Sequence, residues 1–127
     1  GGDCVQFDNS SPLYLQIVRE MTLRIVSGAM QPGEKIPSVR ELAVTFGVNP
    51  NTMQRAMAEM EREGLVYTER TSGRFLTKEE GVLVEKRNLL AQEETEKYLA
   101  YMYQIGFTQE EILNYLRMAQ QKGEKAE

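Results

Sequence analysis

Residues 36–76 read IPSVRELAVTFGVNPNTMQRAMAEMEREGLVYTERTSGRFL, and this stretch decides how the chain folds. Ser38 is followed three residues later by Glu41, a capping box whose side chains satisfy free backbone N–H groups at the start of a helix. Leu42 and Phe46 then recur on one face, and Gly47 suits the left-handed residue that ends a helix. The pattern predicts a first helix of about two turns.

A second helix is predicted after a short Gly-Val connection. Asn49 is a favoured N-cap and Pro50 is favoured at the first helical position. We expect this helix to run to about Glu63 and to stop at Gly64. Its inner stripe, at the spacing i, i+4 and i+7, consists of Met53, Met57 and Met60. Two short helices joined in this way predict a helix-turn-helix.

The second helix presents polar side chains near its start, namely Asn51, Thr52, Gln54 and Arg55. A recognition helix places its N-terminal residues in the major groove, where Arg pairs with guanine and Asn or Gln with adenine. A solvated helix face without a partner is the simplest alternative for such residues. The order of capping box, turn and second cap favours DNA recognition.

A β-hairpin is predicted over residues 65–77, with a turn at residues 71–73. Arg70, Arg74 and Lys78 are expected to give its tip a basic character, which Glu69 dilutes. A basic hairpin beside a recognition helix can follow the DNA backbone or reach the minor groove. The alternative is that these charges only keep an edge strand from aggregating.

The run from Leu13 to Leu76 resembles the DNA-binding domain of the GntR family of bacterial transcription regulators. Several linked blocks carry the resemblance in the right order: PLY at 12–14 with QI at 16–17, PGEKIPSVRELA at 32–43, GVNPNT at 47–52, EREGLV at 61–66, and Gly73. The GVNPNT version and the short C-terminal region resemble the YtrA-like subfamily in particular.

This resemblance implies that Arg40 contacts DNA from the first helix of the pair and that Gly73 is the glycine of the wing tip. It also places Asn49 at a recognition-helix position, whereas Gln54 stands where the subfamily often has a small or aliphatic residue. Together with the residues chosen above, the predicted DNA-binding set is Ser38, Arg40, Asn49, Asn51, Thr52, Gln54, Arg55, Arg70, Gly73 and Arg74.

The charge balance is acidic, which is unusual for a DNA-binding protein. Residues 1–77 carry 8 Lys and Arg against 9 Asp and Glu, and residues 78–127 carry 7 against 10, so the net charges of −1 and −3 sum to −4. Most of the excess acid therefore lies beyond the hairpin. Because phosphate binding depends on a local basic patch and not on the total net charge, the acidic balance does not exclude DNA binding.

Composition also argues against other classes of function. The chain has no histidine and one cysteine, Cys4, which argues against histidine-based catalysis, an ordinary zinc site or an internal disulfide. We therefore predict no enzyme activity, no cofactor and no metal. No apolar run approaches the ~20 residues of a membrane span. With no secretory signal visible, the sequence predicts a cytoplasmic protein without a membrane partner.

The N-terminal part is expected to support this region. Ser11 as N-cap and Pro12 at the first helical position predict a helix that ends at Gly28. Its inner face consists of Tyr14, Ile17, Val18, Met21 and Ile25. Before this helix, the alternating apolar residues Val5 and Phe7 indicate an edge strand.

The C-terminal part predicts a long helix over residues 82–105 and a last helix opened by a capping box at Thr108 and Glu111. The apolar stripe of the long helix needs a partner in order to be buried, and we expect a symmetric homodimer. Folding back of this pair on the preceding domain is the alternative. The predicted dimerisation residues are Leu83, Leu90, Tyr98, Leu99, Met102, Ile105, Ile112 and Leu116. A small-molecule effector stays unknown.

The expected fold is mainly α with a small β-hairpin: a winged helix-turn-helix domain over residues 11–77, followed by a two-helix dimerisation segment over residues 78–127. The expected function is a sequence-specific DNA-binding transcriptional regulator, a dimeric repressor that binds a palindromic operator in double-stranded DNA. The alternative is a winged-helix module that binds another protein and not DNA, and the acidic charge balance is its best support.

Overall fold

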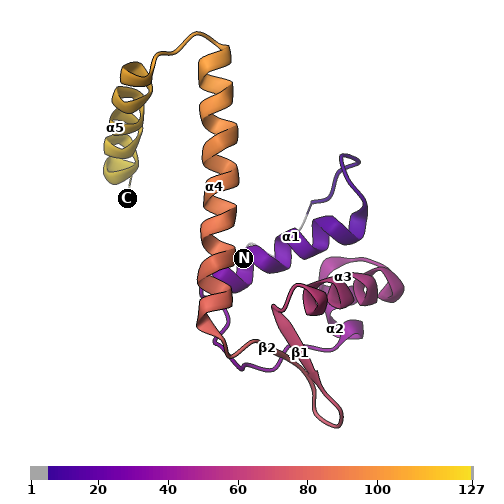
Figure 1. Ribbon diagram of the computed structural model, residues 1–127. Coiled ribbons are helices and arrows are strands. Elements are labelled where there is room, and N and C mark those ends of the chain that lie inside the picture. The colour runs from indigo at the N-terminus through magenta and orange to yellow at the C-terminus, as the bar shows by residue number, and fades with distance from the viewer. Residues whose placement is uncertain (1–5, 127) are drawn as a thin grey trace. The chain divides into compact units, whose positions relative to one another are not determined.

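The computed structural model describes residues 6–126 and is mainly helical with one hairpin, as predicted. Its elements in chain order are α1 (Leu13–Val26), α2 (Val39–Phe46), α3 (Pro50–Arg62), β1 (Val66–Glu69), β2 (Gly73–Leu76), α4 (Glu80–Gln104) and α5 (Gln109–Ala126) (Figure 1). Contacts divide the chain into two units, Gly1–Arg87 and Asn88–Glu127, and α4 continues from the first unit into the second.

Helix α1 buries one of its faces in the core of the first unit, and it starts one residue later than predicted. Pro12 is its N-cap, and no side chain caps the helix. Gln16 instead ties down the preceding segment: its amide nitrogen donates to the carbonyls of Asp8 and Ser11, each at 2.7 Å, and its amide oxygen accepts from the Asp8 N–H at 3.0 Å. The buried face consists of Ile17, Val18, Met21, Thr22 and Ile25.

The predicted helix-turn-helix is confirmed. The Ser38 hydroxyl accepts the Glu41 N–H at 3.2 Å, although the Glu41 carboxylate accepts from the same hydroxyl and not from the Ser38 N–H that a full capping box would engage. Gly47 ends α2 at a φ of 68°, a conformation that glycine adopts without strain. In α3 the stripe of Met53, Ala56, Met57 and Met60 is fully buried.

The hairpin pairs Val66 with Leu76 and Glu69 with Gly73, so its turn spans residues 70–72 and not 71–73. A segment before α2, which was not predicted to pair with the hairpin, forms hydrogen bonds with β2. Its Lys35 bridges to Phe75, and the N–H groups of Gly33 and Ile36 donate to β2 carbonyls at 2.9 Å each. The wing is therefore anchored to the loop that leads into α2.

Two N-terminal expectations have different outcomes. Val5 lies outside the described residues, so its predicted strand is not addressed. Phe7 is described, is not in a strand, and packs against the core with its ring centroid 6.5 Å from that of Phe46. Phe7 therefore packs beside the last residue of α2.

The first turns of α4 belong to the first unit. Val82 and Leu83 pack against its core, and the Lys86 ammonium lies 2.6 Å from the Glu63 carboxylate at the end of α3. Leu83 is thus half-buried against the core of its own chain, and its predicted interface role stays a prediction. Because these residues pack against the core, the first unit runs past Thr77 to Arg87.

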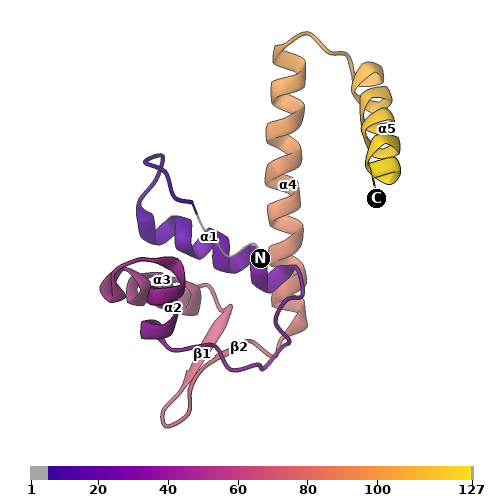
Figure 2. The same cartoon turned by 180° about the vertical axis from the view of Figure 1, so that it is seen from behind.

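The second unit is a pair of helices that buries little of its own apolar surface. Met102 and Ile112 are buried, and the rings of Phe107 and Tyr115 meet edge to face at 5.9 Å. Thr108 and Glu111 form a complete capping box, with reciprocal bonds of 3.0 and 3.2 Å, after which α5 turns back (Figure 2). Among the described residues of this unit, the large apolar side chains left exposed are Leu89, Tyr101, Tyr103, Ile105, Leu113, Tyr115, Leu116 and Met118.

Candidate nucleic-acid interface

The start of α3 presents the polar face that the sequence predicted. The Asn49 side chain caps the helix by accepting the Asn51 N–H at 2.8 Å. Asn51 and Gln54 are exposed, and Thr52 is half-buried beside them. Because the opposite side of the helix is locked into the core by methionine, this face is held in one orientation, and its amides have the chemistry to read base edges.

The start of α2 lies close to the wing. Ser38 caps α2, and Arg40, two residues later, is exposed. A groove of about 640 Å³ runs between this helix start and the hairpin. It is lined by Lys35, Ile36, Pro37, Ser38, Val39, Glu41, Thr68, Ser72, Gly73 and Arg74. Three of the predicted residues, Ser38, Gly73 and Arg74, therefore line one groove.

Gly73 and Lys35 lie next to each other in this groove. Gly73 has a φ of 109°, which L side chains rarely adopt, and a Cβ there would come within 3.3 Å of the Lys35 Cε. Lys35 itself was not in the predicted set. No local motif marks it, since its position beside the wing results from the bridge between its strand segment and Phe75.

The predicted basic tip of the wing is wrong in part. Arg70 lies in the turn and is exposed, but Arg74 points back toward α3, with its Nε 3.9 Å from the Glu61 carboxylate and its side chain only 21% exposed. Glu61 also accepts a hydrogen bond from the Thr68 hydroxyl. The cross-strand pair of Thr68 and Arg74 therefore braces the wing against the end of α3.

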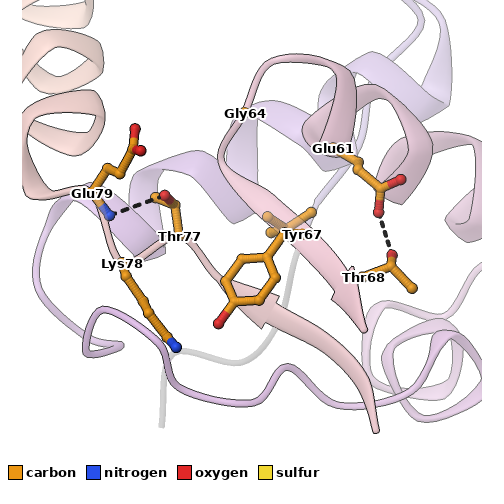
Figure 3. A pocket seen from close by; sticks show the side chains of 8 residues that line it. Glu61, Gly64, Tyr67, Thr68, Thr77, Lys78 and Glu79 are labelled. Carbon is orange, nitrogen blue, oxygen red and sulfur yellow. Dashed lines mark hydrogen bonds between the residues drawn. The ribbon is translucent and has the colours of Figure 1, made fainter. Parts of the chain in front are cut away.

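Lys78 also lies away from the tip. It follows β2, and its ammonium is 5.9 Å from the centre of the Tyr67 ring. Tyr67 lines an open groove of about 600 Å³. Figure 3 shows its ring with Lys78 on one side and the Glu61–Thr68 hydrogen bond on the other. At the far end of this groove, the Thr77 hydroxyl accepts the Glu79 N–H at 3.1 Å, just before α4 begins.

A third groove, of about 380 Å³, lies between the starts of α1 and α3. Its lining consists of Pro12, Leu13, Tyr14, Asn51, Thr52 and Arg55. The Arg55 guanidinium carbon lies 3.9 Å from the centre of the Tyr14 ring. The helical spacing of Tyr14 predicted only a place in the core, because spacing along one helix does not reveal a contact with another helix.

The basic character of α3 is concentrated near its start. At the other end, Arg62 donates to the Glu59 carboxylate, with one bond of 2.9 Å from its Nε. This pairing lowers the pKa of Glu59 and raises the pKa of Arg62. Since the Arg62 charge already has a partner on the same helix, Arg55 is the arginine of α3 that is placed beside the polar face.

The described residues contain no group of three or more His, Cys, Asp or Glu side chains that could hold a metal ion. They also contain no helix that is long and apolar enough to cross a membrane.

Fold and site together define a winged helix-turn-helix protein, with a capped recognition helix, an arginine at the start of the preceding helix and a hairpin beside it. The family model "Bacterial regulatory proteins, gntR family" matches residues 13–76. The chain therefore belongs to the GntR family, and it is a DNA-binding transcriptional regulator.

Relatives match most of the chain. The uncharacterized HTH-type transcriptional regulator YhcF of Bacillus subtilis is 41% identical over 112 residues, which cover 88% of this chain and 93% of that protein. The HTH-type transcriptional repressor YtrA of Bacillus subtilis is 34% identical over 116 residues, 89% of each protein. These matches confirm the predicted YtrA-like resemblance.

Solved structures of GntR-family regulators are similar to this chain. A GntR family transcriptional regulator from Listeria monocytogenes has a TM-score of 0.83 at 38% identity, covering 88% of this chain and 98% of that one. A crystal structure of AraR(DBD) in complex with operator ORX1 has a TM-score of 0.53 at 30% identity, covering 57% of this chain and 93% of that one. The similarity thus extends to a domain that was crystallised on operator DNA.

Proposed function

We propose that this regulator is a cytoplasmic, dimeric repressor that occupies a palindromic operator. The observation that carries the proposal is the start of α3, where capped and exposed polar groups face away from a fully buried methionine stripe. Repression is supported by YtrA, which is named a repressor and matches nine-tenths of this chain. No activity other than DNA binding is needed for a repressor that occludes a promoter.

In this proposal α3 enters the major groove. Asn51 and Gln54 contact base edges, since amide side chains pair with adenine in two-bond geometry. Arg40, at the start of α2, contacts phosphate, where the helix N-terminus also favours an anion. The wing follows the backbone with Arg70, because that arginine alone among the predicted wing cations lies in the turn.

The dimer is proposed from the second unit. Among the described side chains of this unit, only Met102 and Ile112 are buried, and eight large apolar side chains stay exposed. Exposed apolar side chains that gather in one patch mark interaction surfaces. A second copy covers such a surface most simply with two-fold symmetry. The two recognition helices would then contact half-sites about 34–36 Å apart, or a multiple of that spacing.

The test is a selection from random duplex DNA with the full chain at ~150 mM salt, where non-specific phosphate binding is weak. The expected result is an enriched inverted repeat. An enriched single half-site would support recognition by α3 and refute the two-fold dimer. The absence of any enriched sequence would refute the proposal of an operator bound by this chain alone.

A further inference from the structure

We propose that Tyr14 of α1 is a positioning residue for DNA recognition, because its ring holds the Arg55 side chain in place for contact with DNA. This inference rests on the proposed function, and it concerns a residue outside the elements that make the helix-turn-helix and the wing. It assigns a role in binding to a side chain that sequence spacing places only in the core.

The contact itself is close. The Arg55 guanidinium carbon lies 3.9 Å from the centre of the Tyr14 ring, well inside the ~6 Å range of a cation–π interaction. The protein contains two longer contacts of this kind among its described residues, Arg24 over Phe46 at 4.8 Å and Lys78 over Tyr67 at 5.9 Å. The stack of Arg55 on Tyr14 is therefore the tightest of the three.

The ring is a fixed platform. Tyr14 is half-buried and packs against the core, and its neighbours on the next turn of α1, Ile17 and Val18, are buried. Gln16 holds the chain just before α1 through three hydrogen bonds. Arg55, in contrast, is exposed and would otherwise sample many rotamers. The ordered partner thus fixes the flexible one.

Stacking leaves the binding groups of Arg55 available. A guanidinium uses its flat face against an aromatic ring, while its five N–H donors point outward in the plane. Arg55 lines the same groove at the start of α3 as Asn51 and Thr52. The side chain therefore presents its fork at the edge of the recognition helix before any DNA arrives.

The expected effect follows from this preorganisation. Immobilising a flexible side chain on binding has an entropy cost that corresponds to a factor of roughly two to ten in affinity. Without the ring, Arg55 would meet that cost during DNA binding. Tyr14→Leu should therefore weaken binding to the selected operator roughly three- to tenfold. Tyr14→Phe keeps the ring and should stay within about twofold of the wild type.

The experiment is a double-mutant cycle on the full chain, with the duplex recovered by the wild type in the selection as the probe. Affinities are measured for the wild type, Tyr14→Leu, Arg55→Ala and the double variant, together with Tyr14→Phe. Arg24→Ala serves as the control, because it removes one positive charge and one cation–π contact elsewhere in the same unit. Thermal unfolding of each variant without DNA reports on folding separately.

The expected result is that Tyr14→Leu weakens binding in the wild-type background and has no further effect in the Arg55→Ala background. A purely structural role for Tyr14 would instead lower the melting temperature and weaken binding equally in both backgrounds, which would overturn the inference. So would a Tyr14→Leu variant that binds as tightly as the wild type. Failure of the wild type to select any duplex is a different outcome, which refutes the proposed function itself.

Discussion

The cap of the recognition helix gives a test that separates folding from DNA binding. Asn49 is exposed, and its side chain accepts the Asn51 N–H at 2.8 Å. Three substitutions change this group in different ways. Asn49→Ala removes the cap, Asn49→Ser keeps a capping oxygen without charge, and Asn49→Asp keeps the cap and adds a negative charge at the helix start.

The magnitudes follow from the single hydrogen bond. Loss of a side-chain N-cap costs ~1 kcal/mol of folding free energy. In a domain of 60–100 residues that loss lowers the melting temperature by roughly 4–8 °C. Asn49→Ala should show this decrease, whereas Asn49→Ser should stay close to the wild type. Asn49→Asp should melt at or above the wild-type temperature, because a carboxylate is favourable at a helix N-terminus.

DNA binding should follow a different order. Asn49→Asp brings a carboxylate toward the phosphates, and at about 4 Å the repulsion is about 1 kcal/mol in water and larger near a protein surface. Affinity for the selected operator should therefore fall at least about fivefold although the fold is intact. The assays are thermal unfolding without DNA and fluorescence anisotropy with a labelled duplex at two salt concentrations.

Two results would refute the reasoning. If Asn49→Asp keeps its stability and binds the operator as tightly as the wild type, the start of α3 does not lie near phosphate. If Asn49→Ala neither melts earlier nor binds more weakly than Asn49→Ser, the observed cap makes no energetic contribution.

Three further predictions concern other parts of the chain. Leu116→Glu should shift the protein from dimer to monomer in sedimentation, whereas Val44→Glu, at an exposed position of the first unit, should not; a Leu116→Glu dimer would contradict the proposed interface. Gly73→Ala should lower the unfolding free energy by about 1–3 kcal/mol in a denaturant titration, because its φ of 109° strains other residues, and an unchanged value would contradict that account. Hydrogen bonds with the Thr108 backbone N–H and then with its hydroxyl lower the pKa of Glu111, so their stabilisation is present at neutral pH and is lost as pH falls through the folded-state pKa. Thr108→Val keeps the N–H and removes the hydroxyl, so it should raise that pKa only in part in an NMR titration, and a wild-type Glu111 that titrates at its ordinary value would contradict the box.

The helix-turn-helix could be predicted almost completely because its signals are local. Ser38, Asn49 and Gly47 act on backbone groups within about four residues, and the methionine spacing of α3 defines its buried face whatever packs against it. Element boundaries were predicted less accurately. Helix α1 begins one residue later than predicted, and Gly73 belongs to β2 and not to the turn. At each of these boundaries several consecutive residues are compatible with either state.

By itself, the sequence determined the class of fold, the order of elements and the polar face of α3, because caps, glycines and apolar periodicity are properties of short segments. Only the tertiary structure decided which cations face solvent. Arg74 meets Glu61, Arg55 stacks on Tyr14, and Leu83 completes the core of the first unit. Each of these contacts joins residues from different elements, and their geometry depends on how whole elements pack together, which periodicity along one element does not encode.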